Sequence, residues 1–252
     1  GKSGQIISVR RLSRIFLELQ EKGAANINLV TAGHFLPQVC LALSDAKDMG
    51  LDIPVVYNSS GYEEVSSLKL LEGLADIYLP DFKYHSPQLS TAYSHVADYF
   101  ETAAKAVAEM FRQTGPAVIN PQSGLMERGV IVRHLLLPGC TGDSKRILRY
   151  LHTTYGNDIF ISIMNQYTPL PHVAHIPALN RKVTEDEYGR VLAFADKIGI
   201  ERAFMQEEGT AAESFIPPFD GEGLTAPPAS YNNRSLPAGQ VLPHIQNSQN
   251  RT

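Results

Sequence analysis

The sequence has few cysteines: only Cys40 and Cys140, which lie far apart in the chain. Two distant cysteines argue against a disulfide framework and fit a protein of a reducing compartment, which predicts a cytoplasmic location. They also exclude a cysteine-rich metal site in these 252 residues, because such a site needs closely spaced thiolates.

Long apolar runs and clusters of basic residues are missing as well. No apolar run approaches the roughly 20 residues of a membrane-spanning helix, and the opening residues GKSGQIISVRR contain no apolar signal-peptide core. The formal net charge is −4, without a stripe of Lys and Arg. We therefore expect neither a membrane nor a nucleic acid as partner.

The chain is 43% hydrophobic and 19% charged, which is typical of a globular protein with one sizeable core. Helix-like segments alternate with six short strand-like segments rich in Ile, Leu and Val, and this alternation predicts an α/β fold with parallel strands. Either a doubly wound sheet or a (β/α) barrel fits. The predicted strands are residues 27–30, 53–58, 76–82, 129–139, 158–166 and 201–206. Helices are expected over 63–74 and 90–115, with Asp143 or Ser144 as the cap of a later helix and a Thr184–Glu187 capping box at the start of the last one.

An absent motif and a change in composition give two further expectations. No G-x-G-x-x-G follows the first strand, which argues against a dinucleotide-binding fold. From about Gly221 the sequence becomes rich in Pro, Asn, Gln and Ser and loses its apolar periodicity. We therefore predict one domain over residues 1–220 and a disordered tail over 221–252.

Polar residues follow the predicted strands, where a parallel sheet places its ligand. Hydroxyls, amides, a lysine, an arginine and an aspartate would then share one rim, which suits a zwitterionic ligand. The candidate site residues are Thr31, Gly33, His34, Asn58, Ser59, Ser60, Asp81, Lys83, Arg133, Asn165 and Gln166.

Plain structural alternatives exist for several of these residues. Asp81 and Lys83 can form an ion pair that caps a strand, worth under ~1 kcal/mol where partly exposed. Arg133 lies on an apolar face and needs either a ligand or a buried partner. His34 also fits a loop or core histidine. His172 and His175 have a spacing that suits a metal only on a helix, and they lie in a proline-broken loop.

Five motifs in order resemble the radical S-adenosylmethionine (SAM) proteins, in the branch similar to pyruvate formate-lyase activating enzyme. They are INLVTAGHFLPQV, IPVVYNSSGYE, DIYLPDFKY, VIVRHLLLPGCTGD and FMQEEGTAAESFIPPFD. The resemblance implies a partial (β/α)6 barrel, here with its first strand missing. It also implies SAM and a 4Fe–4S cluster as cofactors, and an oxidoreductase or activase that cleaves SAM reductively and abstracts a hydrogen atom.

The resemblance also implies roles for the early candidate residues. The Gly-Gly-Glu strand end of the family, which meets the SAM amino group, falls on residues 31–34, with His34 near the glutamate position. The Thr-Asn-Gly strand end falls on residues 58–61, where Ser59 and Ser60 bring hydroxyls to the methionyl group or the ribose.

The later motifs carry the charged residues. The family's Asp-x-Lys motif matches Asp81 and Lys83, which implies that Lys83 binds the SAM carboxylate and Asp81 orients it. Arg133 resembles the arginine before the family's Pro-Gly turn. Asn165 and Gln166 replace a histidine-bearing strand end.

The largest departure from the family is the missing Cys-x-x-x-Cys-x-x-Cys motif that holds the cluster. The chain is then either a fragment or a truncated relative, inactive alone, and we expect weak or no SAM binding by it. The implied partners are a glycyl-radical-type protein substrate and an electron donor. Two alternatives stay open: a cofactor-free barrel enzyme using Lys83 as a Schiff-base nucleophile, although Asp81 disfavours this, and a non-catalytic module that binds SAM or a protein.

Overall fold

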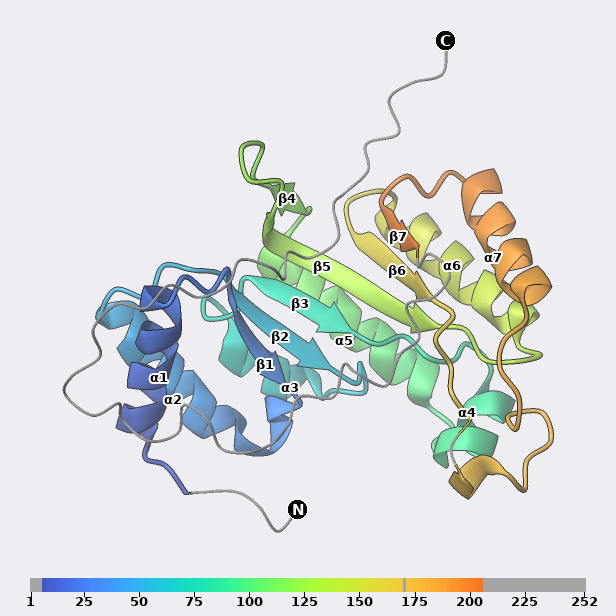
Figure 1. Cartoon of the computed structure of the whole chain (residues 1–252), viewed down its shortest axis with the longest axis horizontal. Coiled ribbons are helices and arrows are strands. Elements are labelled where there is room, and N and C mark those ends of the chain that lie inside the picture. Colours follow the sequence, from blue (N-terminus) through green and yellow to red (C-terminus); the bar gives the residue numbers. More distant parts are fainter. Residues whose placement is uncertain (1–5, 170, 206–252) are drawn as a thin grey trace.

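The computed structural model describes residues 6–169 and 171–205 (Figure 1). Helices and strands alternate along this part of the chain, as predicted. The strands are β1 (Ile27–Val30), β2 (Val55–Ser59), β3 (Ile77–Pro80), β4 (Val118–Ile119), β5 (Met126–Leu135), β6 (Phe160–Met164) and β7 (Ala203–Met205). The α-helices are α1 (Val9–Glu21), α2 (Leu36–Asp48), α3 (Val65–Leu68), α4 (Pro87–Ser94), α5 (Tyr99–Thr114), α6 (Thr141–Tyr155) and α7 (Glu185–Lys197), with short 3₁₀ segments η1 (Ala32–Phe35), η2 (Lys69–Leu71) and η3 (Pro171–Val173).

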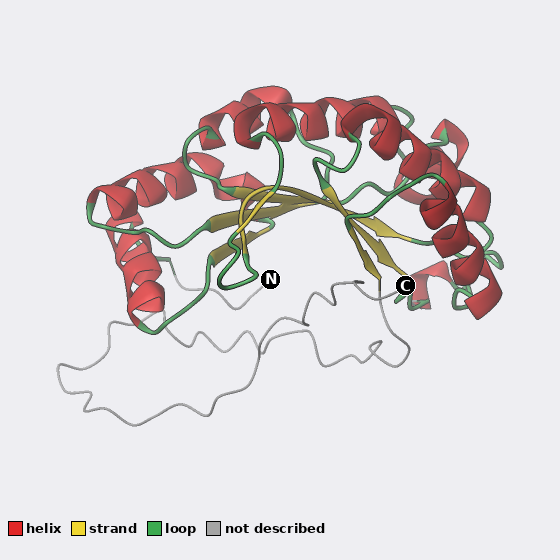
Figure 2. Cartoon of the chain, turned by 90° about the horizontal axis from the view of Figure 1, so that it is seen from above, coloured by secondary structure: helices red, strands yellow, loops and turns green. Residues whose placement is uncertain are grey.

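The strands form one curved sheet in the order β1-β2-β3-β5-β6-β7, in which every neighbouring pair is parallel. The helices line its convex face (Figure 2). The predicted α/β fold, a partial barrel of parallel strands, is therefore confirmed. Within the described residues β1 pairs with β2 alone and so forms one edge of the sheet. The predicted tail over 221–252 and residues 206–220 of the fifth motif lie outside the described residues.

The core explains why these segments form the predicted elements. In α5 the fully buried residues are Ala103, Ala106, Val107 and Met110, which recur at the spacing of one helix face. They pack under β3 and β5, where Tyr78, Val130 and Val132 are also fully buried. Strands that helices cover in this way bury most of their side chains, so apolar residues dominate their sequences.

Three local expectations differ from the structure. The helix expected over 90–115 is two helices, because His95 adopts a left-handed φ of 58° between α4 and α5. The helix expected over 63–74 shrinks to α3 and η2. The cap expected at Asp143 or Ser144 is wrong, since α6 begins at Thr141 and Asp143 lies inside its first turn, where its carboxylate serves other partners. The strand β4 was not predicted; it adds two residues antiparallel to β5.

The capping box predicted at the start of α7 is confirmed. The Thr184 hydroxyl accepts from the Glu187 amide, and the Glu187 carboxylate accepts in turn from the Thr184 amide. Glu187 also accepts from the Gly139 amide and the Arg181 guanidinium, which together hold its pKa well below the usual range. No described helix combines the length and apolar character that crossing a bilayer requires.

Candidate functional site

A polar pocket of about 550 Å³ lies at the carboxyl ends of β1, β2, β3 and β5. The arrowheads of these strands point the same way in Figure 1, so the residues that follow them meet at one rim. The pocket takes in every predicted site residue except Asn165 and Gln166. Its lining is Val30, Thr31, Gly33, His34, Leu36, Asn58, Ser59, Ser60, Tyr62, Glu63, Ser67, Asp81, Lys83 and Arg133.

Three charged side chains form the wall contributed by β3 and β5. One Asp81 carboxylate oxygen lies 2.6 Å from an Arg133 guanidinium nitrogen, and the other lies 3.5 Å from the Lys83 ammonium. Asp81 is thus the partner that the apolar setting of Arg133 requires. The group keeps one positive charge in excess, and Lys83 is 41% exposed. Among the described residues the buried Arg133 Nε has no hydrogen-bond partner. The excess positive charge and the exposure of Lys83 give this wall capacity to bind an anion.

Gly61 lets the end of β2 lie against the end of β3. Its φ is +76°, and a Cβ built on it would stand 1.8 Å from the Asp81 carbonyl oxygen. The Asp81 amide donates to the Ser59 carbonyl at 3.1 Å, which closes the two strand ends together. The wall that carries Asp81 and the wall that carries Ser60 therefore share one backbone contact that only glycine accommodates.

Tyr99, on α5, is hydrogen-bonded to the same two strand ends. The sequence did not predict this residue as part of the site. Its hydroxyl donates toward the carbonyls of Ser60 and Asp81, both at 3.2 Å, and accepts from the Lys83 amide at 3.0 Å. The side chain is buried at 3% exposure, and burial raises its pKa. Tyr62, which lines the pocket, stacks on it at a ring distance of 5.9 Å. Tyr99 therefore positions site residues without reaching the pocket itself.

Glu63 is a second residue of the site that sequence reasoning missed. It follows β2 and lines the pocket, and its carboxyl interacts with the hydroxyl of Tyr57, a buried residue that does not line the pocket. Burial raises the pKa of Glu63, while the Tyr57 hydrogen bond and the nearby His34 act in the opposite direction. Burial likewise raises the pKa of Tyr57. The pocket thus carries a carboxyl group in addition to the Asp81 that Arg133 and Lys83 already pair.

The end of β1 is strained where it meets the pocket. Thr31 adopts a left-handed φ of 56°, which costs a β-branched residue about 1–3 kcal/mol. Its amide is held by the Asn58 carbonyl at 3.1 Å. Strain of this kind is kept where the surrounding structure holds a residue in place, and here it turns the chain into η1, which brings Gly33 and His34 to the pocket.

A buried histidine supports the loop between Asp81 and Lys83. The His134 Nδ1 donates to the Phe82 carbonyl at 2.7 Å, and its Nε2 is hydrogen-bonded to the Ser144 hydroxyl at 2.8 Å. The Asp143 carboxylate accepts from the amides of His85 and Ser86, at 2.8 and 3.0 Å. The start of α6 therefore anchors the chain that leaves β3, and burial lowers the pKa of His134.

This histidine predicts how stability depends on pH. Its pKa in the fold lies below the usual value near 6.5, so the unfolded chain binds more protons once the pH drops below that value. We expect the free energy of unfolding to fall from about pH 6.5 towards the lowered pKa, by at most ~1.4 kcal/mol per pH unit. Urea unfolding at a series of pH values measures this. His134→Gln should reduce the slope of the unfolding free energy against pH. Replacing the exposed His95 with glutamine should not change this slope. Equal slopes in the original protein and both variants contradict the assignment of the pH dependence to His134.

The remaining candidates do not join the polar pocket. Asn165 and Gln166 follow β6; Gln166 is exposed, and its amide contacts the Met164 sulfur at 3.9 Å. Their proposed role in ligand binding stays a prediction. The two cysteines lie on α2 and just before α6. Over residues 6–169 and 171–205, no group of three or more His, Cys, Asp or Glu side chains is placed to hold a metal ion.

No protein-family model matches the chain. It is 28% identical over 181 residues to an uncharacterized protein of Methanocaldococcus jannaschii, and the match covers 70% of this chain and 47% of the relative. The chain thus spans about half the length of the curated relative that it matches. A solved domain of pyruvate-formate lyase-activating enzyme from Bacteroides vulgatus ATCC 8482 is similar with a TM-score of 0.50 and 11% identity, over 72% of this chain and 98% of that chain. At this identity the likeness concerns the fold alone, and the chain shares with that domain an α/β architecture built on a partial barrel.

Proposed function

We propose that the polar pocket binds the zwitterionic methionyl end of S-adenosylmethionine, and that the chain is the barrel part of a radical SAM protein of the activating-enzyme kind. The observation that carries the proposal is the separation of charge in the pocket. Arg133 and Lys83 exceed Asp81 by one positive charge on one side, and Glu63 supplies a carboxyl group on another. A ligand with one carboxylate and one ammonium group complements such a site.

Each part of the ligand has a matching group. The Lys83 ammonium suits the carboxylate, with the Arg133 guanidinium in the same wall of the pocket. Glu63 suits the ammonium group, which removes the need for a glutamate at position 34, where the sequence has histidine. Tyr62 offers an aromatic ring for the nucleoside, held in place by its stacking on Tyr99.

The described residues do not fit a 4Fe–4S cluster, because thiolates must lie close together and Cys40 and Cys140 belong to different helical regions. The proposal for this chain is therefore limited to binding and positioning. Reductive SAM cleavage, an electron donor and a glycyl-radical-type protein substrate belong to the proposed radical SAM protein as a whole. The Schiff-base alternative for Lys83 is disfavoured, since its ammonium is paired with Asp81 at 3.5 Å.

SAM titration tests the proposal. We expect weak, saturable binding by this chain, with a dissociation constant of about 1 mM, because a few charge-assisted contacts act without a cluster. Lys83→Met and Glu63→Gln should each weaken binding about 10-fold, since each removes the partner of one ligand charge. Isothermal calorimetry measures the affinity, supported by chemical shifts of residues that line the pocket.

Matched controls use the same substitutions on the outer helix α5. Lys105→Met and Glu101→Gln remove exposed charges there and should bind SAM like the original protein. Two results overturn the proposal: absence of saturation at ten times the expected dissociation constant, or an equal affinity for Lys83→Met and Lys105→Met. S-adenosylhomocysteine keeps the zwitterion but lacks the sulfonium charge, so it should bind with similar affinity if the charged walls hold the methionyl end.

A further inference from the structure

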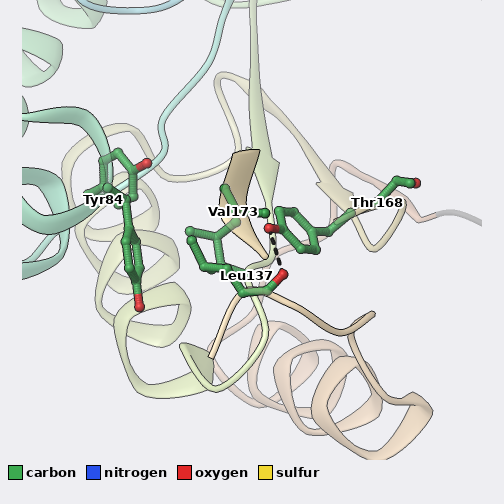
Figure 3. A pocket seen from close by; sticks show the side chains of 7 residues that line it. Tyr84, Leu137, Thr168 and Val173 are labelled. Carbon is green, nitrogen blue, oxygen red and sulfur yellow. Dashed lines mark hydrogen bonds between the residues drawn. The ribbon is translucent and has the colours of Figure 1, made fainter. Parts of the chain in front are cut away.

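A second pocket of about 160 Å³ lies at the carboxyl ends of β3, β5 and β6 (Figure 3). It shares no lining residue with the polar pocket. Its lining is mostly apolar, and three of its residues are tyrosines: the set is Tyr84, Tyr93, Leu137, Tyr167, Thr168, Val173 and Leu179. We call it the tyrosine pocket.

Two of the three tyrosines have hydroxyls that are hydrogen-bonded to other residues of the chain. The Tyr84 hydroxyl is bonded to the Ser94 hydroxyl at 2.9 Å, and the Tyr167 hydroxyl donates to the Leu179 carbonyl at 2.9 Å. The rings of Tyr84 and Tyr93 are 6.4 Å apart and tilted by 50°. Two of the three hydroxyls are thus already satisfied, and the pocket offers an occupant aromatic faces and aliphatic groups.

The tyrosine pocket and the polar pocket are lined by consecutive residues of the chain. Lys83 lines the polar pocket, and the next residue, Tyr84, lines the tyrosine pocket. The same loop is fixed by Tyr99 at the Lys83 amide and by Asp143 at the amide of His85. Both pockets therefore lie along one rim of the sheet and share one hydrogen-bonded segment of the chain.

We infer that the tyrosine pocket binds an aromatic ring of phenol size that belongs to the second reactant. The volume of the tyrosine pocket sets the size of its ligand, because an apolar cavity of about 150 Å³ holds one benzene ring. The lining decides the chemistry, since aromatic pairs are favourable at ring distances of about 4.5–7 Å and in tilted arrangements. The assignment to the second reactant rests on the proposed function; the binding of a ring does not.

The ring can belong to a small molecule or to a protein side chain, and two probes separate these sources. p-Cresol presents the ring alone, and N-acetyltyrosinamide presents it on a peptide backbone. N-Acetylglutaminamide has a side chain of related length without a ring. NMR titration should follow the methyl groups of Leu137 and Val173, because both residues line the pocket. All titrations use the chain without SAM.

We expect p-cresol to shift these methyl signals and to saturate them at millimolar concentration, with no such shifts from N-acetylglutaminamide. Val173→Trp fills the pocket and should weaken p-cresol binding at least about 10-fold, whereas Val118→Trp places the same ring on the distant strand β4 and should change nothing. If N-acetyltyrosinamide binds at least as well as p-cresol, the ring comes from a peptide; weaker binding supports a free aromatic molecule.

The inference is overturned if p-cresol shifts neither methyl signal, or if Val173→Trp binds it as well as Val118→Trp does. Tyr93→Ala provides a second variant on a partly exposed helix position, and it should also weaken binding. Because SAM titration reports on the polar pocket, the two proposals fail separately. Ring binding without SAM binding overturns the proposed function and leaves the tyrosine pocket as an aromatic site.

Discussion

Replacing Gly61 with alanine is expected to lower the free energy of unfolding by about 3–5 kcal/mol. The new Cβ would stand 1.8 Å from the Asp81 carbonyl oxygen, a distance that forces the ends of β2 and β3 apart. The left-handed φ of +76° adds a conformational penalty for any residue with a Cβ. Urea denaturation followed by circular dichroism measures the change.

Gly73 supplies a matched control for this substitution. Its φ is +74°, almost the same as that of Gly61, but a Cβ built on it meets nothing within 4 Å. Gly73→Ala should therefore cost only the conformational penalty of about 1 kcal/mol, and the difference between the two variants isolates the steric clash. If the two substitutions cost the same, the close approach of the strand ends does not determine stability. Gly61→Ala should also weaken SAM binding, because the clash separates Ser60 from Asp81, whereas Gly73→Ala should not.

The central strands of the sheet were predictable because they bury apolar side chains on both faces. In β2 and β3, for example, Val55, Val56, Ile77 and Tyr78 are all buried, so an unbroken apolar run marks each strand in the sequence. The break between α4 and α5 was not predictable in this way. It depends on His95 in a left-handed conformation that its own sequence does not require, and the flanking residues carry helix-compatible spacing.

The site was predictable to the extent that it follows strand ends. Asp81, Lys83 and Arg133 come at the ends of β3 and within β5, so parallel pairing alone brings them together. Tyr99 and His134 act through backbone groups of distant segments, and only the packing of α5 and α6 shows this. Glu63 gave only a weak sequence signal for a site residue, its position four residues after β2. The neighbouring Glu64 has a similar position but is exposed, so the sequence alone could not distinguish the two.

The second large effect concerns Tyr99. Replacing it with alanine removes a buried ring that contacts Phe82, Tyr84 and Tyr62, and it should lower the free energy of unfolding by about 3–5 kcal/mol. Tyr99→Phe keeps the ring and removes only the hydroxyl, which leaves the Lys83 amide without this acceptor. A buried donor left in this way costs about 1–3 kcal/mol.

The pair of variants also distinguishes a positioning role from simple packing. The Tyr99 hydroxyl contacts the backbone of Ser60, Asp81 and Lys83, so Tyr99→Phe should weaken SAM binding even at temperatures where the variant is fully folded. Tyr62→Phe is the matched control for stability, because its hydroxyl bonds to Asp98 at an exposed site and its loss should change the unfolding free energy little. If Tyr99→Phe binds SAM as the original protein does, the hydroxyl stabilises the fold without positioning the pocket, since a displaced Lys83 must change the affinity for a carboxylate.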